Sequence, residues 1–163
     1  MNYFINIGTN LGNRKLNVSK ALQRIMGRFG WFEMSRAVET EPWGYESTNP
    51  YMNVGLRLVS DKTPVEVLAE LQEVEKEICP QPHRDSEGNY MDRVIDIDIM
   101  AIDELKIDTP ELKVPHPHMA EREFFLKPMV ELAPMWRHPD TGLTPGEMLT
   151  ALAAKERDHG TAE

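Results

Sequence analysis

The chain has 163 residues, of which 40% are hydrophobic and 28% charged, and its formal net charge is −9 at pH 7. This length suits a single domain with one core, and the composition is typical of a soluble globular protein. A net acidic chain matches the phosphate backbone of nucleic acids poorly, so we expect no nucleic-acid partner. Apolar runs of membrane-spanning length and the pattern of a signal peptide are both missing from the sequence, so we expect a cytoplasmic protein without a membrane partner.

The first third of the sequence predicts a strand, a helix and a pair of strands. Residues 3–8 read Y-F-I-N-I-G, a β-rich run closed by a glycine. A helix is predicted over 14–29, between Asn13 as N-cap and Gly30, because apolar residues recur at helical spacing at Leu16, Val18, Leu22, Ile25, Met26 and Phe29. The composition of 31–40 and 51–59 predicts two strands, which we expect to pair with each other.

The middle of the chain predicts a second helix and a further strand, separated by a long loop. Thr63 as N-cap and Pro64 in the first turn open a helix to about Ile78, with an apolar face at Val67, Leu68, Leu71, Val74 and Ile78. The polar loop over 81–92 is too long for a simple connection, and loops of that length are often functional. Residues 94–102 alternate apolar residues with aspartate and predict a strand.

The order of these elements predicts the fold class. Strand, helix, strand, strand, helix and strand make the split βαβ arrangement of an α+β ferredoxin-like βαββαβ sandwich. A C-terminal extension of short strands and helices follows, with a helix over 145–155 and a frayed tail after about residue 157. We therefore expect one domain over 1–163.

The sharpest local feature is the acidic pair Asp96 and Asp98. On a strand these side chains point to one face with Val94, and the other face takes Ile95, Ile97 and Ile99. Two neighbouring carboxylates repel unless a cation lies between them, and Mg²⁺ prefers oxygen ligands of this kind. The alternative is an edge strand with an acidic solvent face, and the short pattern leaves both interpretations open.

Basic residues near this pair point to an anion such as phosphate. Arg93 lies just ahead of the pair, and the arginine fork matches phosphate oxygens, although a salt bridge to a neighbouring aspartate is the plain alternative. His116 stands in V-P-H-P-H between Lys113 and Arg122. Phosphate contacts suit His116 and Arg122 better than a transition-metal site does, because a third ligand at the usual spacing is missing. Taken singly, a residue of each of these kinds is more often an ordinary solvent-exposed side chain than part of a binding site.

Several aromatic and amide residues are suited to framing a flat heterocycle, because rings stack on it and an amide reads its nitrogens and carbonyls. They are Trp43, Tyr51, Asn53, Tyr90 and Phe124. The alternative places them in the core. Phe124 fits this alternative because it stands beside Phe125 and Leu126, whereas Asn53, a polar residue inside a strand, does not fit it. The common nucleotide-binding motifs are missing, and the turn at 8–12 has no diagnostic glycine spacing.

Together these segments resemble the 6-hydroxymethyl-7,8-dihydropterin pyrophosphokinase family from about Tyr3 to Met148. The order and the spacing of the matched blocks both fit. The blocks are G-T-N-L-G at 8–12, T-E-P-W-G at 40–44, Y-M-N-V at 51–54, D-R-V-I-D-I-D-I at 92–99, V-P-H-P at 114–117 and R-E-F-F-L-K-P at 122–128.

The resemblance implies an enzyme of folate biosynthesis that moves the terminal two phosphates of ATP to the pterin hydroxymethyl oxygen and releases AMP. It implies two Mg²⁺ ions on Asp96 and Asp98, and ATP and the hydroxymethyl-dihydropterin as small-molecule partners. We also expect a monomer. The nucleotide positions it implies are Gln72, Glu75, Arg93, Ile99, Lys113, His116 and Arg122. The pterin positions it implies are Thr40, Trp43, Tyr51, Asn53, Tyr90 and Phe124.

The chain departs from the family pattern after the second predicted helix. Relatives usually carry Gly-Arg there, with the arginine contributing to catalysis, whereas this chain has Cys79-Pro80. We expect Arg84 or His83 to take that role beside Arg93, because loops of this kind close over bound substrates. The departure also leaves open a second interpretation, a catalytically weakened homologue that binds pterin or nucleotide without efficient transfer. An unrelated Mg²⁺-dependent phosphohydrolase is the third reading.

Overall fold

The computed structural model describes residues 1–40, 50–79 and 94–161. Expectations for Trp43, His83, Arg84, Tyr90 and Arg93, and for the loop over 81–92, therefore lie outside the described residues. The described residues form a mixed α/β structure with an antiparallel sheet and four α-helices. None of the described helices is long and apolar enough to cross a membrane.

The main sheet is built around the first strand of the chain. β1 (Asn2–Thr9) pairs antiparallel with β4 (Tyr51–Val59) on one side and with β5 (Asp96–Ile102) on the other. The far edge of β4 pairs with β2 (Phe32–Met34) and β3 (Val38–Thr40), so the order is β2-β4-β1-β5 with β3 also beside β4. This topology places the N-terminal strand directly between the two strands that carry Asn53 and the acidic pair.

The first helix, α1 (Arg14–Phe29), begins and ends where the sequence predicts. The Asn13 side chain accepts a 3.1 Å hydrogen bond from the Leu16 N–H, and Gly30 follows with φ at 82°. The buried face differs in part, because Leu16 and Met26 are about half exposed, at 48% and 49%. The residues that α1 buries are Asn17, Val18, Ala21 and Ile25.

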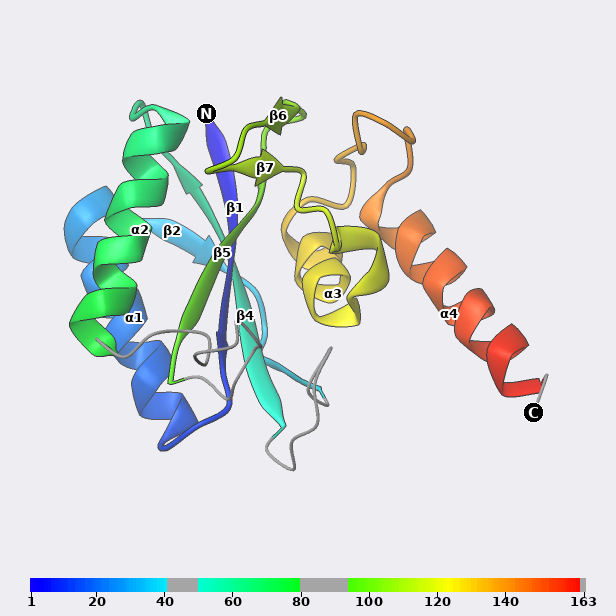
Figure 1. The fold of residues 1–163 in the computed structure, drawn as a ribbon, viewed down its shortest axis with the longest axis horizontal. Coiled ribbons are helices and arrows are strands. Elements are labelled where there is room, and N and C mark those ends of the chain that lie inside the picture. Colours follow the sequence, from blue (N-terminus) through cyan, green and yellow to red (C-terminus); the bar gives the residue numbers. More distant parts are fainter. Residues whose placement is uncertain (41–49, 80–93, 162–163) are drawn as a thin grey trace.

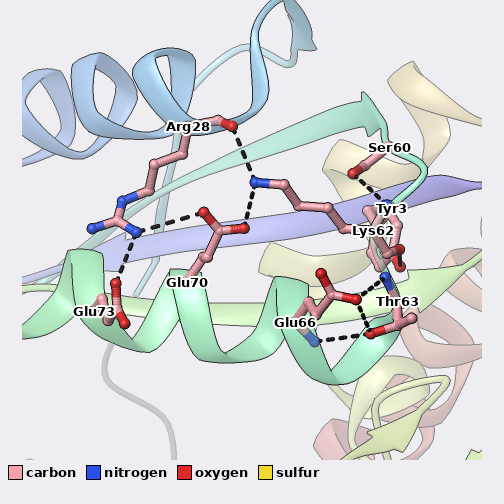
Figure 2. A network of polar contacts seen from close by, with 8 residues as sticks. All are labelled: Tyr3, Arg28, Ser60, Lys62, Thr63, Glu66, Glu70 and Glu73. Carbon is pink, nitrogen blue, oxygen red and sulfur yellow. Dashed lines mark hydrogen bonds and ion pairs between the residues drawn. The ribbon is translucent and has the colours of Figure 1, made fainter.

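The second helix, α2 (Pro64–Ile78), is also confirmed, with Thr63 and Glu66 forming a capping box at its start. Figure 2 shows how charged side chains join this helix to α1. The Arg28 guanidinium lies 2.8 Å from the carboxylate of Glu73, and the Lys62 ammonium, just before α2, donates a 3.3 Å hydrogen bond to the Arg28 backbone carbonyl. These contacts hold the two helices side by side on one face of the sheet.

The strand predicted over 31–40 is two short strands, β2 and β3, both paired with β4 as expected. Ser35 explains the interruption. Its backbone N–H donates to the Gly55 carbonyl at 2.9 Å, while its Oγ accepts from the Gly55 N–H at 2.8 Å. Because a side chain replaces one backbone partner, the edge strand leaves the regular ladder at this residue.

The C-terminal third contains more regular structure than the sequence predicts. β5 begins at Asp96 and not at Val94, and the short strands β6 (Ile107–Asp108) and β7 (Lys113–Val114) follow. A 3₁₀ turn η1 (Met119–Glu121) leads into α3 (Glu123–Leu132), where only short elements were expected. The last helix, α4 (Pro145–Thr161), runs past its predicted end at residue 155.

Alternation along β1 divides the core between the two faces of the sheet. Tyr3, Ile5 and Ile7 pack on the side of α1 and α2, with Ile95, Ile97 and Ile99 as predicted. Phe4 packs on the other side with α3 and the start of α4. Figure 1 shows the same layers, with α1 and α2 on one side of the sheet, α3 on the other and α4 beyond α3.

Candidate active site

Three strands bring five residues together on the α3 side of the sheet, and we call them the polar cluster. In the register of the sheet, Gly8 of β1 lies between Asn53 and Asp96, and Asn6 lies opposite Asp98. Asn6 and Gly8 lie two and four residues after Phe4 in β1, and Asn53 lies two residues before Gly55 in β4, so they share the face that contacts α3. Asp98 and Asp96 lie opposite Asn6 and Gly8 and therefore belong to the same face. The polar cluster is Asn6, Gly8, Asn53, Asp96 and Asp98.

Gly8 makes room for the amide of Asn53. A Cβ atom at Gly8 would lie 2.8 Å from the Asn53 Oδ1 atom and 3.5 Å from the Tyr51 ring, and the first distance is closer than real Cβ contacts. The glycine therefore lets the Asn53 and Tyr51 side chains lie against the backbone of β1. The neighbouring side chains leave no room for a Cβ atom here, so this position requires glycine.

Asn53 is the most unusual polar residue of the polar cluster. Its side chain is buried, with 2% exposed, and among the described residues nothing accepts a hydrogen bond from its Nδ2 group. A buried amide without a partner is costly, so such a group calls for an explanation. A bound ligand with an acceptor atom would satisfy it.

Asp96 and Asp98 are the acidic part of the polar cluster, and both are partly buried. They project from the same face of β5, as the sequence predicts. Within the described ranges, no group of three or more acidic, histidine or cysteine side chains is placed to hold a metal ion. Two carboxylates alone suit Mg²⁺, which takes its remaining ligands from water and substrate phosphates.

The start of α3 lies next to the polar cluster. Asn6 Nδ2 donates a 2.9 Å hydrogen bond to the backbone carbonyl of Phe124, which joins β1 to the first turn of the helix. The Phe124 ring meets the Phe125 ring edge-on, with 5.2 Å between their centroids. The Arg122 guanidinium lies 5.6 Å from the Phe124 ring and 5.2 Å from the Phe125 ring, a cation–π arrangement on a buried arginine.

His116 reaches this group of rings from the segment after β7. Its backbone N–H donates to the Met100 carbonyl at 2.8 Å, where a register shift between β1 and β5 leaves an extra residue in β5. Its imidazole meets the Phe125 ring edge-on at 4.8 Å. The bulge in β5 thus positions His116 on the same side of the sheet as Phe124 and Arg122.

The protonation state of His116 follows from its surroundings. Burial lowers the pKa of His116 to about 3, and the positive charge of Arg122 acts in the same direction. The Nδ1 atom accepts a 3.1 Å hydrogen bond from the His118 backbone N–H. At neutral pH the ring is therefore uncharged, and its proton is on Nε2, where it can be donated to an oxygen of a ligand.

Other candidates from the sequence lie outside the polar cluster. Gln72 is exposed on α2 and Lys113 is exposed on β7, with its ammonium 3.9 Å from Asp108.

Glu75 is buried on α2 and accepts a 2.7 Å hydrogen bond from the Ile97 backbone N–H. The Ile99 side chain is buried in the core on the α1 and α2 side, so only its backbone is left for a nucleotide. Thr40 ends β3 opposite Tyr51.

The structure adds two residues that the sequence reasoning missed, Asn6 and Gly8. The signal for Asn6 was the same as for Asn53, an asparagine inside an apolar strand. Phe124, for which the sequence favours the core, is only partly buried, whereas Phe125 and Leu126 are fully packed. The site therefore combines the acidic pair Asp96 and Asp98, the buried amide of Asn53 and the ring of Phe124. The side chains of Arg122 and His116 lie beside the neighbouring Phe125 ring.

The chain is similar to one described protein family and to bacterial relatives that carry its name. The family model described as 7,8-dihydro-6-hydroxymethylpterin-pyrophosphokinase (HPPK) matches residues 4–134. The 2-amino-4-hydroxy-6-hydroxymethyldihydropteridine pyrophosphokinase of Porphyromonas gingivalis is 39% identical over 139 residues, which are 84% of this chain and 93% of that protein. The enzyme of the same name from Aquifex aeolicus is 32% identical over 136 residues, 83% of this chain and 82% of that protein.

A solved structure shares the fold. The crystal structure of Plasmodium falciparum HPPK-DHPS with pteroate superimposes with a TM-score of 0.76 over 98% of this chain, at 12% sequence identity. This chain spans 44% of the length of that one, and at such identity the likeness concerns the fold alone. The family model and the two bacterial relatives are the stronger findings, and they show that the chain belongs to the 7,8-dihydro-6-hydroxymethylpterin-pyrophosphokinase family.

Proposed function

We propose that this protein transfers pyrophosphate from ATP to 6-hydroxymethyl-7,8-dihydropterin in folate biosynthesis, at the polar cluster and the adjoining start of α3. The observation that carries the proposal is the register in which Gly8 separates Asn53 from Asp96. In this register the Asn53 amide and the Asp96 carboxylate flank β1 on one face of the sheet, which supports a role of the amide in reading the ligand and of the carboxylates in binding a cation. A heterocycle with a reactive hydroxymethyl group needs both.

The pterin half of the proposal rests on Asn53, Tyr51 and Phe124. The buried Nδ2 of Asn53 would donate to the ring carbonyl or a ring nitrogen, which supplies the partner that the described residues do not. The partly buried ring of Phe124 would stack on the flat heterocycle. Thr40, Trp43 and Tyr90 are assigned to the same half by the family resemblance.

The phosphate half rests on Asp96 and Asp98, whose carboxylates would hold two Mg²⁺ ions. The bound ions would neutralise phosphate charge and align the reacting oxygens. The neutral His116 would donate its Nε2–H to a phosphate oxygen, and Arg122 would add positive charge. Gln72, Glu75, Arg93, Ile99 and Lys113 are assigned to nucleotide binding by resemblance, and Arg93 also to catalysis. Arg84 is assigned to catalysis only because it lies close in the sequence to the position of the missing family arginine.

The transfer itself is a single displacement. The pterin hydroxyl oxygen forms a bond to the β-phosphorus of ATP, the bond between that phosphorus and the α-phosphate oxygen breaks, and AMP leaves. The hydroxyl proton passes to solvent or to a phosphate oxygen. The residues of this chain contribute by holding the two substrates in line and by excluding water as a competing acceptor.

Further proposals concern the fold, the oligomeric state and the cellular location of the protein. The strand order β2-β4-β1-β5, with α1 and α2 on one face, supports a ferredoxin-like βαββαβ core. We also propose that the protein acts as a monomer in the cytoplasm, with ATP and the pterin as its partners. Each of these is separate from the catalytic proposal.

One assay tests the function. The protein is incubated with ATP and Mg²⁺, with and without 6-hydroxymethyl-7,8-dihydropterin, and AMP and phosphate are followed. We expect AMP to form only when the pterin is present. Phosphate release without pterin would point to a phosphohydrolase, and pterin binding without AMP would point to a homologue that has lost transfer.

A further inference from the structure

Helix α3 contains a proline that removes one of its own hydrogen bonds. In an α-helix the carbonyl of a residue accepts from the N–H four positions later. The carbonyl of Phe124 would accept from residue 128, which is a proline without an N–H, inside the helix. The proline ring also crowds that same carbonyl. Phe124 therefore needs a hydrogen-bond donor from outside the helix.

Asn6 provides this donor. Its Nδ2 group lies 2.9 Å from the Phe124 carbonyl oxygen, and the Asn6 side chain is 2% exposed. The bond joins positions 118 residues apart in the sequence, so it fixes α3 relative to β1 and not only the local helix. A carbonyl that is shielded from water and has no donor destabilises the folded protein, so we expect this hydrogen bond to contribute to the position of α3.

Gly55 brings the proline to the same point of the sheet. Gly55 lies opposite Asn6 in the register of β4 and β1. A Cβ atom at Gly55 would lie 2.5 Å from the Cβ atom of Pro128, which real Cβ contacts essentially never show. The glycine thus permits α3 to rest directly on β4, beside the residue that repairs the helix hydrogen bond.

We propose that Asn6 is a positioning residue that holds the Phe124 ring over the polar cluster and thereby sets the affinity for the pterin. This inference rests on the proposed function, because it takes the ligand of Phe124 to be the pterin. Asn6 acts through the backbone of Phe124 and not on the reacting atoms. It lies opposite Asp98, so an effect on the metal side has to be separated from an effect on the ring.

A double-mutant cycle with Pro128 isolates the hydrogen bond. Asn6→Leu keeps the approximate shape of the side chain but removes the donor and adds no charge near Asp98. Pro128→Ala restores a backbone N–H that can donate to Phe124 within the helix, and it keeps the Cβ atom that rests on Gly55. The two changes together should therefore largely cancel at Phe124.

The steady-state KM values are compared among the wild type, N6L, Pro128→Ala and the double variant. A merely structural role of Asn6 would not change the KM for the pterin selectively. We expect N6L to raise the KM for 6-hydroxymethyl-7,8-dihydropterin about fivefold, with the KM for ATP and the Mg²⁺ requirement within about twofold. In the Pro128→Ala background the same N6L change should alter the pterin KM by less than about twofold. If N6L does not fold, Asn6→Ser removes the amide with a smaller disturbance.

Tyr3→Phe is the matched control. It also removes one side-chain donor to a backbone carbonyl, the 2.7 Å bond from Tyr3 to Lys62, but on the opposite side of the sheet. It should lower stability without a selective change in the pterin KM.

Three outcomes would overturn the inference. They are an unchanged pterin KM in N6L, an equal rise of both KM values, and a loss in N6L that Pro128→Ala does not rescue. A wild-type protein that shows no pterin-dependent AMP would instead overturn the proposed function, and this inference with it.

Discussion

The carboxylate of Glu75 accepts a 2.7 Å hydrogen bond from the backbone N–H of Ile97, the residue between Asp96 and Asp98. Ile97 also pairs with Ile7 of β1, so β5 is held from both sides at this position. Glu75 comes from the buried face of α2, on the side of the sheet opposite α3. A helix on one face thus fixes the backbone that presents two carboxylates to the other.

Removal of this contact should loosen the acidic pair. We expect Glu75→Ala to lower the free energy of unfolding by about 2 kcal/mol, because a buried N–H loses a charged acceptor. The Mg²⁺ concentration for half-maximal activity should rise several-fold, because Asp96 and Asp98 are less well placed. Glu75→Gln keeps an acceptor oxygen and should show the smaller effect on both urea denaturation and Mg²⁺ titration. Equal Mg²⁺ curves for all three proteins would contradict the positioning role.

The charge of Asp98 should be required for transfer. Asp98→Asn is nearly isosteric, so the fold should be retained, while pterin-dependent AMP formation should fall by about a hundredfold or more, because metal binding is weakened. Asp61→Asn, at an exposed position in the turn before α2, is the matched change and should leave activity intact. Circular dichroism checks the fold of both variants. An Asp98→Asn protein with full activity would remove the metal assignment.

Gly8→Ala tests the contact between β1 and the buried amide. The new Cβ atom would lie 2.8 Å from Asn53 Oδ1, so the amide has to move away from its position. We expect the KM for the pterin to rise about tenfold or more, with a smaller change in the KM for ATP. Gly27→Ala is the control, because its Cβ atom meets nothing within 4 Å in α1.

The control makes a prediction of its own. Alanine is favoured over glycine inside a helix by about 1 kcal/mol, so Gly27→Ala should stabilise the protein in urea while both KM values stay the same. A pterin KM that moves equally in the two variants would argue against a specific role of Gly8.

The elements that sequence reasoning predicted well are those with local signals. Asn13 before α1 and the Thr63 capping box before α2 act within one turn of their helix, and both mark the helix starts correctly. The same-face placement of Asp96 and Asp98 follows from the two-residue period of a strand, and the structure has it. None of these depends on a partner far away in the chain.

The features that sequence reasoning missed depend on distant partners. The break between β2 and β3 comes from Ser35 and its contacts with Gly55 in another strand. Only short elements were expected where α3 lies. Its Pro128 disfavours a helix locally, and the helix continues where Asn6, distant in the sequence, supplies a donor to Phe124. The role of Gly8 requires the register of β1 with β4, which a single sequence does not specify.

The charged network between α1 and α2 should matter for stability and not for catalysis. The Arg28 guanidinium contacts Glu70, Glu73 and Glu77, and the hydrogen bonds that it donates to Glu77 and Glu73 raise the pKa of Arg28. Exposed pairs of this kind contribute about 1 kcal/mol or less, and salt screens them. Arg28→Met should therefore lower stability slightly at low salt, less at 1 M salt, with unchanged kcat and KM. A clear loss of activity would show that the two helices influence the site.

His116 should make stability depend on pH. Its pKa is lowered to about 3 in the folded protein by burial, with Arg122 and His118 adding to the effect, whereas the unfolded chain titrates near the ordinary value of 6.5. Between these two values the unfolded state binds the extra proton, so stability contributed by the neutral ring is present above about pH 6.5 and is lost as pH falls towards 3. The contribution to the slope is at most about 1.4 kcal/mol per pH unit.

The measurement for His116 compares two proteins across that range. Urea denaturation of the wild type and of His116→Asn at pH 7, 6, 5 and 4 gives the two slopes. Asparagine cannot take up the proton, and its oxygen can still accept from the His118 N–H. We expect the variant to be less stable at pH 7 but to lose less stability per pH unit below 6. Parallel curves would mean that His116 titrates alike in both states, and its assignment as a neutral Nε2–H donor to phosphate would then be wrong.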